Sequence, residues 1–144
     1  MSGPLERKME EIQHILENLI AEAANGTPII VEGPRDRESL ERLEVKGDVI
    51  SAKTKGKTLL DTLQEIEDRN KDEVILLMDF DRRGKEMTAH LIKNLEKSRI
   101  KTNLVFWKKL SRLVGRDAKD IEGLATFIQT LNKKIGKDAS DLSL

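Results

Sequence analysis

The chain of 144 residues contains no cysteine and no tyrosine. Without cysteine there is no disulfide framework, no thiolate zinc site and no cysteine nucleophile. Without tyrosine, mechanisms that pass through a phosphotyrosine intermediate are excluded. Aromatic residues make up only 3% of the chain, and Trp107 is the single tryptophan.

Net charge and long apolar runs are also missing. The 26 lysines and arginines balance 26 aspartates and glutamates. This balance argues against a bulk electrostatic binder of nucleic acid, although a neutral total can hide a basic rim around an acidic site. No apolar run is long enough to cross a membrane, and the N-terminus is a charged amphipathic segment rather than a signal peptide. We therefore expect a soluble, cytoplasmic protein with no membrane partner.

The chain alternates short apolar runs with segments of helical periodicity, and its length suits a single domain. The predicted strands are Pro28–Val31, Asp48–Ala52, Val74–Met78 and Thr102–Trp107. Such alternation predicts an α/β fold, a parallel four-stranded sheet of order 2-1-3-4 sandwiched by helices.

Helical periodicity divides the rest of the chain. Residues 1–26 are predicted to form an amphipathic helix that packs on the domain and is also a candidate interface for a homodimer. Residues 27–135 are predicted to form the domain itself, closed by a helix over Ala118–Lys134, and 136–144 a flexible tail.

Acidic residues follow two of the predicted strands. Asp79 and Asp81 end the third strand, and side chains two apart on an extended segment point the same way. Glu32 and Gly33 end the first strand. If the first and third strands are neighbours, Glu32 faces both aspartates at the edge where such sheets bind ligands. The alternative is that the aspartates form an acidic turn that caps the next helix.

Carboxylates that lie so close together repel unless one is protonated or a cation sits between them. Neither His14 nor His90 stands beside these acids, so oxygen ligands and therefore Mg²⁺ or Mn²⁺ are favoured. Two further acids are secondary candidates: Asp36, whose other role is a helix cap, and Asp120, which could supply a carboxylate to a second metal.

Basic residues gather after the same strand ends, where a phosphate backbone would lie. Trp107 is a candidate for stacking on a base, with packing in the core as the alternative. The nucleic-acid-binding candidates are Arg35, Lys53, Lys55, Lys57, Arg82, Arg83, Lys85 and Lys108.

The two acidic strand ends read IIVEGPRD and ILLMDFDRRGKE. In this form they resemble the Toprim domain over roughly Pro28 to Trp107, and are most similar to the small stand-alone Toprim proteins and the 5S ribosomal RNA maturases. The resemblance implies that Glu32 is the general acid or base of phosphodiester chemistry, and that it helps Asp79 and Asp81 to hold Mg²⁺.

Three other families share parts of this pattern. Gly56-Lys57-Thr58 looks like the end of a P-loop, but Ser51 stands where its first glycine is required. Haloacid-dehalogenase-type phosphatases place their paired aspartates on the first strand and want a small hydroxyl residue where Arg83 stands. Receiver domains expect paired acids at strand one and a lysine after strand five.

Within the Toprim family, a topoisomerase needs a tyrosine from a partner domain, and a primase needs a zinc module and a polymerase region. We therefore expect a Mg²⁺-dependent nuclease that acts on RNA or DNA. The alternative is a noncatalytic, metal-dependent nucleic-acid-binding protein, or an accessory subunit of a nucleic-acid-processing complex with a protein partner.

Overall fold

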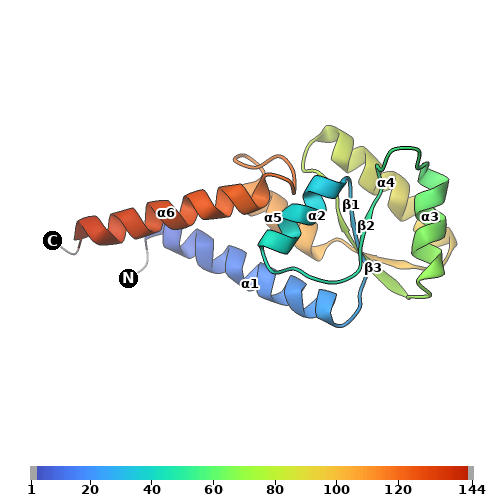
Figure 1. The fold of residues 1–144 in the computed structure, drawn as a ribbon, viewed down its shortest axis with the longest axis horizontal. Helices are drawn as coiled ribbons and strands as arrows, with labels where there is room; N and C mark the ends of the chain where they lie inside the picture. Colours follow the sequence, from blue (N-terminus) through green and yellow to red (C-terminus); the bar gives the residue numbers. More distant parts are fainter. Residues whose placement is uncertain (1–2, 143–144) are drawn as a thin grey trace.

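The computed structural model of the protein describes residues 3–142, and for 137–142 it describes the backbone alone. A parallel sheet lies between layers of helices (Figure 1). Its strands are β1 (Ile29–Val31), β2 (Val49–Ser51), β3 (Glu73–Leu77) and β4 (Lys101–Asn103). The helices are α1 (Pro4–Ala24), α2 (Pro34–Arg42), α3 (Leu59–Asp68), α4 (Arg82–Lys97), α5 (Val105–Val114) and α6 (Leu124–Leu142).

The strand order is β2-β1-β3-β4, and every neighbouring pair is parallel. Ile30 of β1 is in register with Ile50 of β2 on one side and with Leu76 of β3 on the other. The structure thus confirms the predicted α/β fold and the order 2-1-3-4. Because the order reverses between β1 and β3, the carboxyl ends of these two strands form the place where ligands bind in such sheets.

Alternation along the strands explains how both faces of the sheet are buried. Ile30 and Leu76 point to one face, where Leu91 and Leu95 of α4 cover them. The other face carries residues such as Val31 of β1 and is covered by α1, α2, α5 and α6. Each face therefore has its own apolar cluster, as a buried parallel sheet requires.

The N-terminal helix α1 belongs to the second of these layers. It buries Ile12 and Leu19 completely and Leu16 almost completely, and it packs against α5 and α6. In Figure 1, α1 and α6 run side by side away from the sheet. The apolar stripe of α1 is thus used within the chain, and a homodimer through this helix stays a prediction.

The fourth strand is shorter than the predicted Thr102–Trp107, and that prediction is wrong at its end. β4 stops at Asn103, whose side-chain oxygen accepts a hydrogen bond from the backbone N–H of Val105 at 3.0 Å. Helix α5 begins there and buries Phe106 and Leu110, four residues apart as one helical face requires. The apolar run that reads as a strand is therefore the first turn of a helix.

The C-terminal region also differs from the prediction. The last helix, α6, starts at Leu124 rather than near Ala118, because residues 115–123 form a loop. It continues to Leu142, so the predicted flexible tail is helical up to that residue. Residues 136–142 contain no proline, and a single glycine does not stop a helix. Residues 143 and 144 lie outside the described part.

Over the described residues, none of the helices combines the length and the apolar character that a membrane span needs.

Candidate metal centre at the carboxyl edge of the sheet

Glu32 and Asp79 meet where β1 and β3 end. Val31 of β1 is in register with Leu77 of β3, so the residues that follow the two strands emerge side by side. The backbone N–H of Asp79 donates a hydrogen bond to Oε1 of Glu32 at 3.2 Å. Glu32 is only 8% exposed. The predicted meeting of these two strand ends is therefore present.

Lys53 is the cation closest to this pair. Its Nζ lies 3.4 Å from Oε2 of Glu32, and its backbone N–H donates to the carbonyl oxygen of Glu32 at 2.6 Å. Glu32 is therefore oriented by an amide on one carboxylate oxygen and an ammonium on the other. The sequence analysis placed Lys53 among the phosphate-binding candidates, and its contact with Glu32 was not foreseen.

Asp79 is a titratable group with an unusual environment. Burial, a hydrogen bond with the Glu32 side chain and the negative charges of Glu32, Asp36 and Asp120 together raise the pKa of Asp79 from 3.8 to about 8. At neutral pH and without a cation, Asp79 is therefore mostly protonated.

Asp36 lies one helical turn beyond Glu32 and is 6% exposed. Its Oδ2 accepts the backbone N–H of Gly33 at 2.8 Å, so it caps α2. Burial raises the pKa of Asp36, backbone hydrogen bonds from Gly33 and Glu122 oppose this, and the charges of Glu32 and Asp120 add to the rise. Asp36 therefore caps a helix and also contributes charge to the site.

Asp120 reaches the site from the loop 115–123. The backbone N–H of Phe80 donates to the carbonyl oxygen of Lys119 at 2.8 Å, which ties this loop to the chain between Asp79 and Asp81. Asp120 accepts the backbone N–H of Gly123 at 2.8 Å. Its charge contributes to the raised pKa of Asp79, so the structure brings this secondary candidate to the predicted place.

Asp81 has a different position from Asp79. It is exposed, and its Oδ1 accepts the backbone N–H of Gly84 at 2.8 Å, which starts α4. This is the capping role that the sequence analysis gave as the alternative. A Cβ on Gly84 would lie 2.0 Å from the carbonyl oxygen of Asp79, so the glycine allows α4 to begin this close to the site. Metal binding by Asp81 stays a prediction.

The donor chemistry of the site fits Mg²⁺. Carboxylate oxygens are its preferred protein ligands, and a cation would relieve the repulsion that raises the pKa of Asp79. Among the side chains that the structure describes, no three acidic or histidine residues are gathered closely enough to hold a metal ion. Because Mg²⁺ is commonly held by one or two carboxylates with water in its other positions, Glu32 and Asp79 could hold it without a third acidic side chain.

The predicted basic residues fall into three groups. Lys55, Arg83, Lys85 and Lys108 are exposed and make no ion pair within the described part of the chain. Two others form surface pairs, Arg35 with Glu122 and Arg82 with Glu86. Lys57 is different, because its side chain is only 17% exposed.

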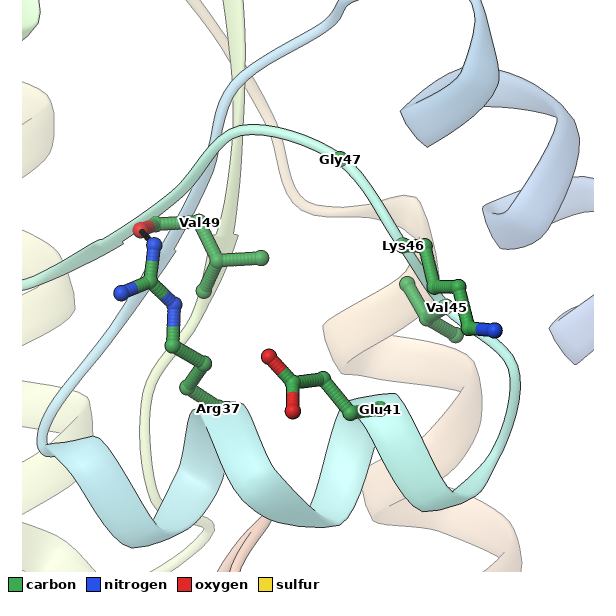
Figure 2. Close-up of a pocket in the computed structure, with 6 residues that line it drawn as sticks. All are labelled: Arg37, Glu41, Val45, Lys46, Gly47 and Val49. Carbon is green, nitrogen blue, oxygen red and sulfur yellow. Dashed lines mark hydrogen bonds between the residues drawn. The ribbon is translucent and has the colours of Figure 1, made fainter.

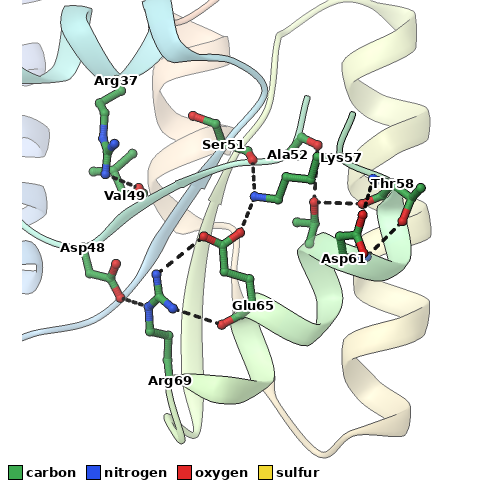
Figure 3. A network of polar contacts seen from close by, with 11 residues as sticks. Arg37, Asp48, Val49, Ser51, Ala52, Lys57, Thr58, Asp61, Glu65 and Arg69 are labelled. Carbon is green, nitrogen blue, oxygen red and sulfur yellow. Dashed lines mark hydrogen bonds and ion pairs between the residues drawn. The ribbon is translucent and has the colours of Figure 1, made fainter. Parts of the chain in front are cut away.

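Lys57 belongs to a polar network along the outer edge of β2 (Figure 3). Its ammonium donates to the carbonyl oxygen of Ser51 at 2.7 Å and pairs with Glu65. Glu65 also pairs with Arg69, which contacts Asp48 at 2.7 Å. Lys57 is therefore occupied inside the protein, and we leave it out of the nucleic-acid surface.

Trp107 is also occupied. It lies in the first turn of α5 instead of at a strand end, and its indole N–H donates to the carbonyl oxygen of Met78 at 2.9 Å. This bond supports packing, the alternative that the sequence left open, and ties α5 to the residue before Asp79.

A cavity of about 280 Å³ lies beside β2 and the C-terminal half of α2 (Figure 2). Arg37 points into it and donates to the carbonyl oxygen of Val49 at 2.6 Å. None of the acidic site residues lines this cavity. It is therefore separate from the carboxyl edge where Glu32 and Asp79 meet.

Comparison with known proteins places the chain in a family. The model of the Toprim domain matches residues 27–111. The chain is 37% identical over 127 residues to the UPF0292 protein MJ1624 of Methanocaldococcus jannaschii, which covers 88% of this chain and 94% of that protein. It is 32% identical over 130 residues to the UPF0292 protein Mbar_A0484 of Methanosarcina barkeri, which covers 90% and 89%.

A solved structure of a protein from Aquifex aeolicus has a similar fold, with a TM-score of 0.64 at 22% identity over 77% of this chain and 95% of that one. The Toprim match covers more than half of the chain and includes Glu32 and Asp79, whereas Asp120 lies outside it. The finer likeness to 5S ribosomal RNA maturases stays a prediction. The chain belongs to the Toprim domain family, and this membership indicates a metal-dependent role connected with nucleic acid.

Proposed function

We propose that the protein is a Mg²⁺-dependent nuclease that hydrolyses phosphodiester bonds of RNA or DNA. The observation that supports this most is the contact of Glu32 with Asp79 at the carboxyl edge of a Toprim sheet, where the Glu32 carboxylate accepts the backbone N–H of Asp79 and interacts with its side chain. Perturbed titration of a group in such a position is typical of functional sites. Glu32 and Asp79 would hold the metal ion, with Asp81 as a further ligand.

A magnesium ion bound there supplies the positive charge that stabilises a reacting phosphate. The hydrolysis itself forms a bond from a water oxygen to phosphorus and breaks the bond from phosphorus to the leaving oxygen. Glu32 would accept the proton that the water loses, and the leaving oxygen would take up a proton from solvent. The ammonium of Lys53, 3.4 Å from Glu32, holds this carboxylate in place.

The exposed cations support the choice of substrate. Lys55, Arg83 and Lys85 follow the same strand ends as the acids, and none forms an ion pair with another described residue. A phosphate backbone that approaches Glu32 and Asp79 would pass between positive charges, although the net charge of the chain is zero.

A noncatalytic role as a nucleic-acid-binding or accessory protein is the second candidate. It is favoured by one observation, that no three acidic or histidine side chains of the described part already enclose a cation site. In that case a partner would supply the nucleophile or the specificity, and the carboxyl groups would bind metal without turnover.

The test is to incubate the protein with labelled single-stranded, duplex and structured RNA and DNA, in Mg²⁺, Mn²⁺ or EDTA. We expect cleavage that needs the metal and is lost in Glu32→Gln, while binding is retained. Glu17→Gln is the matched control, because Glu17 is exposed on α1. Binding without cleavage on every substrate would support the accessory role instead.

A further inference from the structure

A groove runs between α3 and α4, next to the acidic site. It is lined by Lys53, Leu59, Arg83, Glu86, Met87 and His90 and has a volume of about 320 Å³. We propose that this groove holds one unpaired nucleotide of the nucleic-acid substrate, with its phosphate against Lys53 and Arg83 and its base against Leu59 and Met87. The proposal rests on the proposed function, because it names the substrate class of the same site.

Lys53 fixes the place of the groove relative to the chemistry. Lys53 lines the groove, and its Nζ lies 3.4 Å from Oε2 of Glu32. A phosphate that contacts this ammonium is therefore next to the carboxylate that would accept the proton. The nucleotide in the groove is accordingly the one beside the reacting phosphate.

The charge of the groove suits an anion. Arg83 is exposed and forms no ion pair among the described residues, so its guanidinium is available for a bidentate contact with phosphate. Among the residues that the structure describes, Glu86 is the only acid that lines the groove, and it is paired with Arg82 at 3.2 Å. Arg83 thus faces the groove without a carboxylate partner among the described residues, whereas Lys53, whose side chain is 47% exposed, shares its ammonium with Glu32.

The groove also has an apolar part. Leu59 is 37% exposed, and Met87, on the facing side of α4, is half-buried. In a duplex the bases are stacked inside, and mainly phosphates and groove edges are presented to a protein. An unpaired nucleotide presents an apolar base beside its phosphate, which matches apolar side chains placed next to cations.

The size of the groove agrees with a small ligand. Its volume of about 320 Å³ lies at the lower end of the range that small-molecule sites occupy, roughly 300–1,000 Å³. His90 adds an imidazole that can donate to or accept from a base edge. We therefore expect single-stranded or gapped nucleic acid to bind more tightly than a blunt duplex.

The experiment measures binding in EDTA, so that it does not depend on turnover. The probes are a fluorescent strand of 12 deoxythymidines and a strand of 12 abasic units with the same phosphates. We expect the wild-type protein to prefer the thymidine strand, and Leu59→Ala to reduce this preference about fivefold, the effect of one or two buried methylene groups. Leu60→Ala is the matched control, because Leu60 is 75% exposed and does not line the groove.

A second pair of variants tests the phosphate contact. Arg83→Gln should weaken both strands alike, since both carry the same phosphates. Arg99→Gln should leave both unchanged, because Arg99 lines a different cavity, beyond the amino ends of the strands. Thermal unfolding of each variant shows that it is folded.

Four outcomes decide the proposal. The proposal would be overturned if the wild type and Leu59→Ala preferred the thymidine strand over the abasic strand by the same factor. It would also be overturned if the protein did not bind the thymidine strand. If the protein cleaves nucleic acid but shows no such preference, the proposal for the groove is wrong and the proposed nuclease activity is supported. If the preference is present and no substrate is cleaved, the proposal for the groove is supported and the proposed nuclease activity is wrong.

Discussion

The carboxyl group of Asp79 interacts with the side chain of a second acid, Glu32, and is partly buried. The pKa of Asp79 is raised from 3.8 to about 8. Between these values the folded protein binds more protons at this site than the unfolded chain does. The free energy of unfolding of the metal-free protein therefore contains a contribution that is lost as the pH rises toward about 8.

We predict that Asp79→Asn flattens this pH dependence and makes the metal-free protein more stable than the wild type above pH 8. The reason is that an amide cannot ionise beside Glu32. Urea unfolding in EDTA across the pH range measures the effect. Asp72→Asn, at an exposed aspartate elsewhere, should leave the pH dependence unchanged. Equal slopes for the wild type and Asp79→Asn would contradict the prediction.

Gly84 allows the start of α4 to approach Asp79. We predict that Gly84→Ala lowers the free energy of unfolding by about 1–3 kcal/mol, because the added methyl overlaps the backbone. Its Cβ would lie 2.0 Å from the carbonyl oxygen of Asp79. Gly136→Ala, in α6 with nothing within 4 Å of its Cβ, should be neutral or stabilising. A thermal unfolding midpoint of Gly84→Ala equal to that of the wild type would show that the backbone can move aside.

At the scale of elements, β2 is an edge strand whose outer carbonyl groups are occupied by side chains. Arg37 donates to Val49 and Lys57 donates to Ser51, two residues further along the strand. Edge strands offer such groups to other chains, and cationic side chains are one way in which proteins block them. The outer edge of β2 is therefore poorly suited to accept another strand.

This assigns Lys57 a structural role that can be tested. We predict that Lys57→Ala lowers the free energy of unfolding by about 1–2 kcal/mol, because it removes a charged hydrogen bond and leaves Glu65 with one cation fewer. Lys55→Ala, two residues away and exposed, should change it by less than about 0.5 kcal/mol. For nucleic-acid affinity we expect the reverse: Lys55→Ala should bind more weakly than Lys57→Ala.

Some of the helices and strands could be predicted from the sequence, and others could not. The strands β1 to β3 were predictable because each is a short apolar run followed by a turn. The start of α5 was not, since residues 104–107 are apolar enough for a strand and the side chain of Asn103 decides the outcome. The proximity of Asp120 to Asp79 was a guess at most, because it depends on the contact between Phe80 and Lys119, which no local pattern reveals.

For the whole molecule, the family match and the folding unit do not coincide. The Toprim match covers residues 27–111. The helices α1 and α6 lie outside it, yet they cover part of one face of the sheet. We predict that a fragment of residues 27–111 shows no cooperative unfolding in urea, because that apolar face would be open to water. The full chain should unfold in a single transition, and a cooperative transition of the fragment would contradict this.

The pairing of α1 with α6 has a consequence for how the protein is made. These helices come from opposite ends of the described chain and pack against each other, so their contacts are among the most distant in sequence. A ribosome has to finish α6 before α1 can bury the part of its apolar face that packs against α6, and until then that part is exposed to other nascent chains and to chaperones. Contacts of this kind slow folding, so the pairing of α1 with α6 should be a late step that follows the synthesis of α6.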